Sequence, residues 1–169
     1  MTSKIGTLAL AGFLALGSCA ASAGVTVNYV NAEKFSDMPT SNWERQEVLH
    51  DLSAYFTKLG RQLPAGQELT VEITDIDLFG RGYPSSTARE VRLAKTVAEW
   101  PTMSLRYTVS ANGRVIGSGA NQLKDMNFHA RRDVRPEDGN LRYEKRMIND
   151  WFKHTILRKA DTARVAMEY

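Results

Sequence analysis

Two stretches of the chain carry hydrophobic residues at the spacing of an amphipathic helix. In the first, apolar positions recur three and four residues apart and form one stripe, made of Val48, Leu49, Leu52, Tyr55, Phe56, Leu59 and Leu63. Ser41 and Glu44 precede this stripe with the spacing of a capping box, which predicts that the helix begins there. A second helix is predicted from about residue 141 to residue 158, with an inner face of Tyr143, Met147, Ile148, Trp151, Phe152 and Thr155.

The segment 68–78 alternates like a strand, but its phase changes in the middle. Leu69, Val71 and Ile73 share one parity, whereas Ile76 and Leu78 have the other. A single extra residue returns later side chains to the original face of a sheet. We therefore predict a β-bulge near positions 74 and 75.

The dipeptide Asn112-Gly113 lies in the middle of a second alternating segment, residues 103–122. Both residue types tolerate positive φ, so the pair predicts a hairpin with a two-residue turn. In the register that this turn sets, the facing pairs on the buried side are Val109 with Ile116, Tyr107 with Ser118, and Leu105 with Ala120. The opposite, open face then carries Arg106, Thr108, Ser110, Gly117 and Gly119.

With further strands at residues 25–30 and 89–94, and a loop at residues 79–87, the element order is β-α-β-β-β-β-α. This order predicts an α/β (α+β) fold, a two-layer sandwich with one mixed, mostly antiparallel sheet and two helices on one face. We expect one globular domain over residues 24–158 and a frayed tail over residues 159–169.

The N-terminal segment has the three parts of a secretory signal peptide. Lys4 supplies the positive charge, residues 5–16 are an uncharged apolar run, and Ala21-Ser22-Ala23 is a small-x-small cleavage site. The run has about twelve residues, fewer than the roughly 20 that span a bilayer. We expect cleavage after Ala23 and a periplasmic protein. The alternative is a lipobox at residues 16–19, in which Cys19 is lipidated and anchors the chain to the envelope.

Charge and cysteine content narrow the function classes. The chain has 22 basic and 19 acidic residues and a net charge of +3, which falls to +2 when Lys4 leaves with the signal peptide. So small an excess gives no basis for nucleic-acid binding. Cys19 is the single cysteine, so the folded domain has no disulfide, and its stability must come from its core.

Five segments of the chain resemble a known bacterial family, the domain of unknown function 3016. They are VTVNYVNAEKFSD, DIDLFG, EWPTMSLRYTV, SGANQLKDMNF and LRYEKRMINDWF, in the expected order along the mature chain. The resemblance implies a Gram-negative envelope protein with a signal sequence. It implies no activity and no cofactor, because the family has none assigned.

Asp75 and Asp77 are the first candidate site residues. Two carboxylates at i and i+2 on a strand share a face and could hold a hard cation such as calcium or magnesium. The interpretation that we prefer is that they mark the bulge and pair with nearby arginines, because acids are common at strand ends and turns. We therefore expect no metal ligand and no bound cofactor.

The last helix carries a polar stripe of Arg142, Arg146, Asn149 and Lys153, spaced 4, 3 and 4 residues apart. Three cations in a line could bind lipid phosphate, another anionic ligand or an acidic partner. The alternative is an ordinary solvated helix face.

Glu144 departs from the helix pattern, because it lies on the same side as Trp151 and so faces the sheet. A buried carboxylate needs a partner, and Arg106 or Arg92 could supply it. This predicts a structural ion pair rather than a catalytic acid, although acids whose pKa is perturbed by their surroundings also occur at active sites.

No sequence motif for a nucleophile, a zinc site or a phosphate-binding loop is present, and no catalytic residue is assigned. The leading hypothesis is therefore a non-catalytic binding or accessory module of the envelope. Its partner would be an envelope protein or an anionic ligand, with membrane contact only if Cys19 is lipidated. One alternative is a metal-dependent hydrolase that uses Asp75 and Asp77 with Asp125 or Glu144. The other is a lipid-anchored accessory subunit of an envelope complex.

Overall fold

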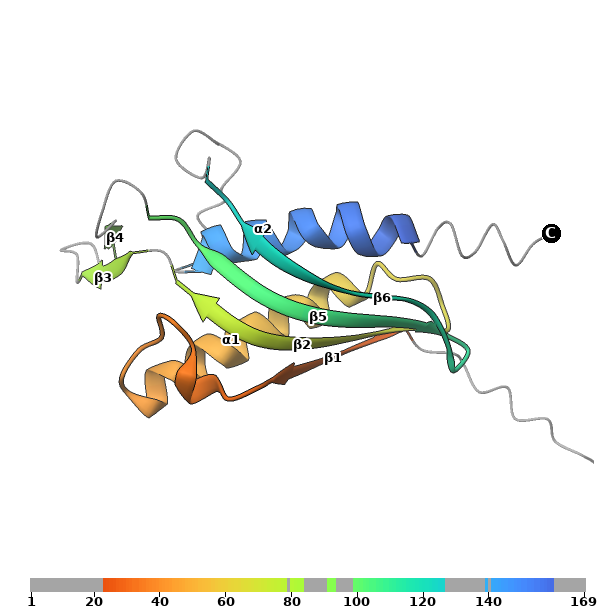
Figure 1. Ribbon diagram of the computed structural model, residues 1–169, viewed down its shortest axis with the longest axis horizontal. Helices are drawn as coiled ribbons and strands as arrows, with labels where there is room; N and C mark the ends of the chain where they lie inside the picture. Colours follow the sequence, from red (N-terminus) through yellow and green to blue (C-terminus); the bar gives the residue numbers. More distant parts are fainter. Residues whose placement is uncertain are drawn as a thin grey trace, which may run out of the picture.

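A four-stranded sheet forms the centre of the computed structural model (Figure 1), which describes residues 23–78, 80–83, 91–93, 99–126, 139 and 141–159. The strands β1 (Gly24–Tyr29), β2 (Gln67–Asp77), β5 (Thr102–Ala111) and β6 (Arg114–Lys124) lie in the order β1-β2-β5-β6. β1 pairs with β2 in parallel, and the other two pairs are antiparallel. β1 and β6 are therefore the two edges of this sheet.

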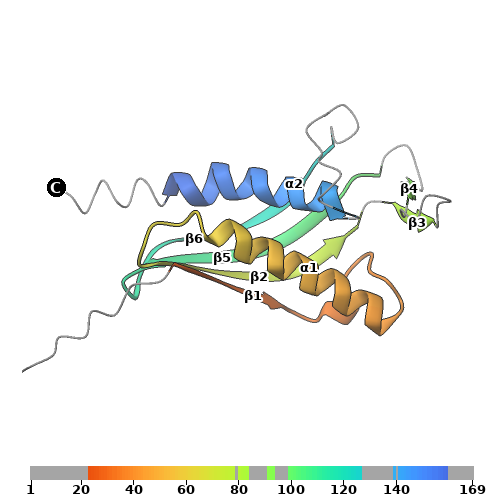
Figure 2. The ribbon, with the colours of Figure 1, turned by 180° about the vertical axis from the view of Figure 1, so that it is seen from behind.

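Both helices cover one face of the sheet, as Figure 2 shows. α1 (Asn42–Gly60) connects the parallel strands β1 and β2, and the Ser41 hydroxyl accepts a hydrogen bond from the Glu44 amide at 3.5 Å. α2 (Arg142–Trp151) continues directly into a π-helical segment, Phe152–Leu157. The predicted two-layer α/β sandwich is thus confirmed, and so is the predicted start of the first helix. Within the residues described, no helix is long and apolar enough to cross a membrane.

Between β2 and β5 the chain forms a second, two-stranded sheet of β3 (Arg81–Tyr83) and β4 (Val91–Leu93). β4 lies within the predicted strand at residues 89–94. β3 lies inside the predicted loop at residues 79–87 and adds one strand to the predicted order. Three residues are too few to show an alternating pattern, so this strand has no signal of its own in the sequence.

The bulge predicted in β2 is present. The register passes from Ile73 opposite Leu105 to Asp75 opposite Ser104, so Thr74 is the extra residue. The Thr74 hydroxyl donates a hydrogen bond to the Ser104 carbonyl oxygen at 3.2 Å. As a result Ile76 is fully buried, with the other apolar residues of its strand.

The turn of the β5–β6 hairpin is also as predicted, with φ of 50° at Asn112 and 75° at Gly113. The facing pairs beyond the turn are wrong, however. Ser110 faces Val115, and the next pair is Val109 with Gly117, so Ile116 is an extra residue in a second bulge. Tyr107 consequently faces Gly119, and Leu105 faces Asn121. The helix-facing side of β6 therefore carries two glycines and an asparagine instead of Ser118 and Ala120.

Replacing Gly113 with valine tests the turn itself. A β-branched side chain resists positive φ, so Gly113→Val should lower the free energy of unfolding by about 1–2 kcal/mol. Urea denaturation measures this, with Asn112→Gly as a control that leaves both turn positions permissive. A Gly113→Val protein as stable as the wild type would contradict the assigned turn.

The core lies between the sheet and the helices, and two aromatic residues connect its layers. Trp151 of α2 is 6% exposed and meets Phe56 of α1 edge-on at 6.3 Å and Tyr107 of β5 edge-on at 5.6 Å between ring centroids. Tyr29 of β1 donates a hydrogen bond to the Leu49 carbonyl at 2.8 Å, and burial raises the pKa of this phenol to about 12. Trp43, near the start of α1, is 72% exposed and is not part of this core.

Candidate functional site

A groove runs between the end of β6 and α2. Its volume is about 320 Å³. Residues 122–125, at the end of β6 and just after it, line one wall, and Met147, Asp150, Trp151 and His154 line the other. α2 follows the β6 edge of the sheet in both Figure 1 and Figure 2. We call this feature the β6–α2 groove.

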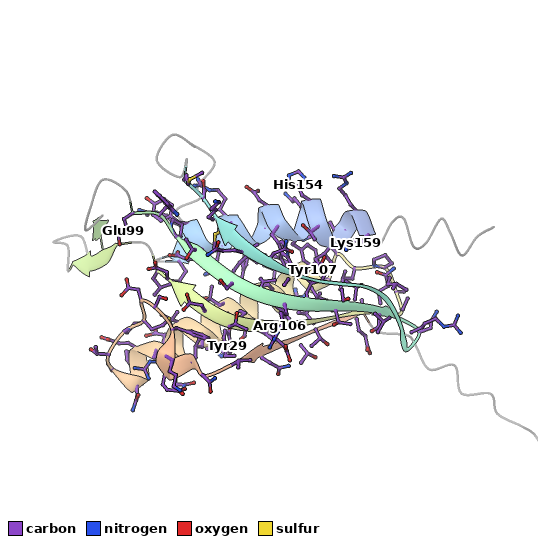
Figure 3. All side chains as sticks on the ribbon, in the orientation of Figure 1. Tyr29, Glu99, Arg106, Tyr107, His154 and Lys159 are labelled. Carbon is purple, nitrogen blue, oxygen red and sulfur yellow. The ribbon has the colours of Figure 1, made fainter. Side chains whose placement is uncertain are left out.

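The floor of the groove is apolar, and its rim is polar. Leu123, Met147 and Trp151 are 7%, 5% and 6% exposed, so they are tightly packed at the bottom of the groove. Lys124 and His154 are exposed at its rim. Figure 3 shows His154 on the outer side of the helix. An apolar floor with a few polar groups around it is typical of binding sites in proteins.

The position of Trp151 in the floor is fixed. Its indole N–H donates a hydrogen bond to the Asn121 side-chain oxygen at 3.1 Å. The ring contacts with Phe56 and Tyr107 hold its other sides. The second bulge of the hairpin makes this possible, because it turns Asn121 toward the helix layer. The floor is therefore formed before any ligand binds.

An ion pair closes one end of the groove and joins β6 to α2. The Nη2 and Nε atoms of Arg146 lie 2.6 Å and 3.1 Å from Oδ2 of Asp125, and the two side chains are 5% and 11% exposed. The predicted polar stripe of Arg142, Arg146, Asn149 and Lys153 is thus wrong at Arg146, which points inward. Lys153 is exposed, and Arg142 is half-buried with its guanidinium 4.9 Å from the centre of the Tyr143 ring.

Lys145, which no sequence pattern singled out, ties the two helices together. Its ammonium group lies 2.8 Å from Asp51 of α1 and 5.9 Å from the centre of the Tyr55 ring. Glu144, Lys145 and Arg146 are all buried, at 0%, 8% and 6% exposed. The first turn of α2 is therefore enclosed on several sides. A run of three charged residues in the sequence gives no sign of this, because helical periodicity predicts only one buried face.

Glu144 faces inward as its helix position predicts, but Arg106 is not its partner. Arg106 forms an ion pair at 3.1 Å with Glu72, its register partner on β2. Both residues lie on the open face of the sheet, away from the helices. Figure 3 shows Arg106 on β5, within the central sheet. The side chain of Arg92, the other predicted partner, lies outside the described residues.

Asp75, through its carboxylate, and Asp77, through its backbone, both contact the connector between β1 and α1. Asp75 accepts hydrogen bonds from the amide and the hydroxyl of Ser36 at 2.7 Å and 2.8 Å, which fixes the connector between β1 and α1. Asp77 forms a backbone bridge with Asp37 in the same connector. Ser36, rather than an arginine, is thus the partner seen for Asp75. In the part of the chain that the structure describes, no three His, Cys, Asp or Glu residues are placed to hold a metal ion.

Among the described residues, no three of the four acids of the hydrolase hypothesis are placed to hold one metal ion. Asp75 and Asp77 follow the bulge of β2 and contact the β1–α1 connector, whereas Asp125 and Glu144 belong to the ends of β6 and α2. Catalysis by paired carboxylates needs both groups at one substrate bond. The described geometry therefore does not favour this hypothesis.

Comparison with known proteins agrees with the sequence resemblance. A family model described as a protein of unknown function (DUF3016) matches residues 23–154. The crystal structure of protein XCC0632 from Xanthomonas campestris, of family DUF330, is similar with a TM-score of 0.42 and 9% sequence identity, covering 88% of this chain and 89% of that one. No curated protein matches the chain.

Proposed function

Since the chain belongs to the DUF3016 family, whose description names no activity, we propose from its structure that it is a non-catalytic binding module and that the β6–α2 groove receives its partner. The observation that carries this proposal is the preformed apolar floor of Leu123, Met147 and Trp151 beside an edge strand. The side chains of this floor are already held in place, which keeps the cost of binding low.

The charges around the groove favour a largely uncharged contact. Asp125 and Arg146 neutralise each other at one end, and the remaining charged groups of the rim are Lys124 and Asp150, of opposite sign. The three-cation stripe that would attract an anionic ligand is interrupted at Arg146. The groove therefore fits a partner protein better than a lipid phosphate.

A plug in the groove tests the proposal. His154→Trp adds a large side chain at an exposed rim position, and His50→Trp adds the same side chain at an exposed position of α1. Each full-length variant is cross-linked in its native envelope and recovered by affinity. His154→Trp should yield at least about tenfold less partner than the wild type, which corresponds to about 1.4 kcal/mol of binding free energy. His50→Trp should yield the wild-type amount. Equal yields from the two variants would contradict a partner in the groove.

We also propose that the chain is exported and that its signal peptide is removed after Ala23. The sequence pattern of residues 1–23 supports this, and β1 begins directly afterwards at Gly24. Mass spectrometry of the protein released from the periplasm without detergent should give the mass of residues 24–169. A mass that includes an acylated Cys19 would instead establish the lipid-anchored alternative.

A further inference from the structure

β6 is an edge of the sheet, and alternate backbone groups along it point away from β5. The Asp125 amide donates to the Pro101 carbonyl at 3.4 Å, in the register that continues the β5–β6 pairing. In an antiparallel pair, residues that bond to the neighbouring strand alternate with residues that do not. The N–H and C=O groups of Lys124, Gln122, Ala120 and Ser118 are therefore directed toward the open edge. No described strand lies beyond β6.

The composition of this edge lacks the usual protection against a further strand. Residues 115–123 contain no charged residue and no proline, and charge is confined to Arg114 and Lys124 at the two ends. Edge strands that must stay single are commonly protected by an inward charge or a proline within the strand. The bulge at Ile116 interrupts only the hairpin end of β6. The stretch from Ser118 to Lys124 is regular, and none of the described residues pairs with its outward backbone groups.

The groove lies where the side chains of an added strand would go. A strand paired with β6 would lie about 4.8 Å from it, and its side chains would alternate between the open face and the helix face. Residues of that strand across from Asn121 and Leu123 would project toward α2, where Met147 and Trp151 form the groove floor. Two apolar side chains at i and i+2 would therefore enter the groove together.

We propose that the ligand of the β6–α2 groove is an extended peptide segment of a partner protein, which pairs with Ser118–Lys124 of β6 and places apolar i and i+2 side chains against Met147 and Trp151. This inference rests on the proposed function and adds the class of ligand. Backbone pairing supplies affinity, and the alternate side chains in the groove supply specificity.

A second copy of the chain fits this edge less well than a peptide. Pairing of two β6 strands over their whole length would set Arg114 of each copy opposite Lys124 of the other, whereas a peptide needs only Ser118–Lys124 and carries no such fixed charge. Like charges directly across a strand pair are destabilising. Each copy would also bring its own α2, which runs along the same edge (Figure 2).

The test separates the backbone of β6 from its side chains at one position. Gln122 is exposed, and its backbone amide is directed toward the open edge. Gln122→Pro removes this N–H, which a paired peptide would use, and proline is tolerated on an edge strand. Gln122→Ala removes the side chain and keeps the N–H. A displayed library of random linear peptides, selected on the wild-type chain, supplies the probe. Ala120→Pro and Ala120→Ser repeat the comparison, and thermal melting checks that each variant folds.

Selected peptides should share apolar residues at i and i+2 and should slow amide hydrogen exchange at Ser118, Ala120, Gln122 and Lys124. The proline variants should weaken binding at least about tenfold, and Ala120→Ser less than about twofold. Gln122→Ala removes a side chain that lines the groove and should weaken binding less than Gln122→Pro does. Three results of the peptide experiment would overturn the inference: no enriched peptide, slowed amide exchange on β1 instead of β6, or proline variants that bind like the wild type. A concentration-dependent dimer that Gln122→Pro abolishes would also overturn it. Loss of the native partner in His154→Trp but not in Gln122→Pro would overturn the strand pairing and leave the proposed function standing.

Discussion

Replacing Arg146 with methionine should lower the free energy of unfolding by about 3–5 kcal/mol, the usual cost of removing one partner from a buried ion pair. The change takes two hydrogen bonds from Asp125, whose side chain is only 11% exposed and cannot recover them from bulk water. Methionine keeps most of the aliphatic volume, so the effect reports the lost guanidinium. Urea denaturation at neutral pH measures it.

Arg106→Met is the matched control for this prediction. The Arg106–Glu72 pair joins two strands at a similar distance, but its side chains are 60% and 44% exposed. Exposed pairs contribute less than about 1 kcal/mol, so Arg106→Met should be nearly neutral. The double variant Asp125→Leu with Arg146→Met should regain much of the lost stability. Equal losses for Arg146→Met and Arg106→Met would show that the Asp125–Arg146 pair is not buried as described.

Gly119→Val should destabilise the fold by about 2–3 kcal/mol, because the new side chain has no room. A Cβ atom at Gly119 would lie 2.9 Å from the Tyr107 hydroxyl and 3.0 Å from its ring. The Tyr107 ring cannot move aside easily, since it is 5% exposed, meets Trp151 edge-on at 5.6 Å, and has the Lys159 ammonium group 5.4 Å from its centre. Figure 3 shows Tyr107 and Lys159.

Ser118→Val tests the same register from the other side. Ser118 is exposed on the open face, so valine there should change stability by less than about 0.5 kcal/mol. The hairpin without a bulge at Ile116 predicts the reverse order, with Ser118 inside and Gly119 outside. Thermal or urea melts of the two variants therefore decide between the registers. A neutral Gly119→Val together with a damaging Ser118→Val would contradict the structure.

The elements with local signals are the ones that sequence reasoning predicts. The Ser41 cap and the stripe of α1 depend on residues within a few positions of each other, and so does the change of phase that marks the bulge in β2. The turn at Asn112-Gly113 is equally local. Nothing about Ile116 itself indicates the second bulge, which reverses the parity of every later residue in β6.

The candidate site depends on contacts between residues that are far apart in the sequence. The sequence therefore predicts the helix and the strands that form the site, but not how their side chains meet. Helical spacing places Arg146 on a polar stripe, but its burial is decided by Asp125, 21 residues earlier. Asp75 meets Ser36 across 39 residues. The groove itself exists because β6 is the edge of the sheet, and strand order has no marker in a single sequence.

Photo-cross-linking tests most directly whether the β6–α2 groove is the binding surface. A photoreactive phenylalanine analogue is placed at Lys124 or His154 on the groove rim, or at Thr70 on the open face, in the full-length chain within its native envelope. All three positions are exposed, so each can react with a partner that covers it. We expect one adduct of the same mass from Lys124 and His154 and none from Thr70. An adduct from Thr70, with none from the two groove positions, would contradict the assignment of the groove.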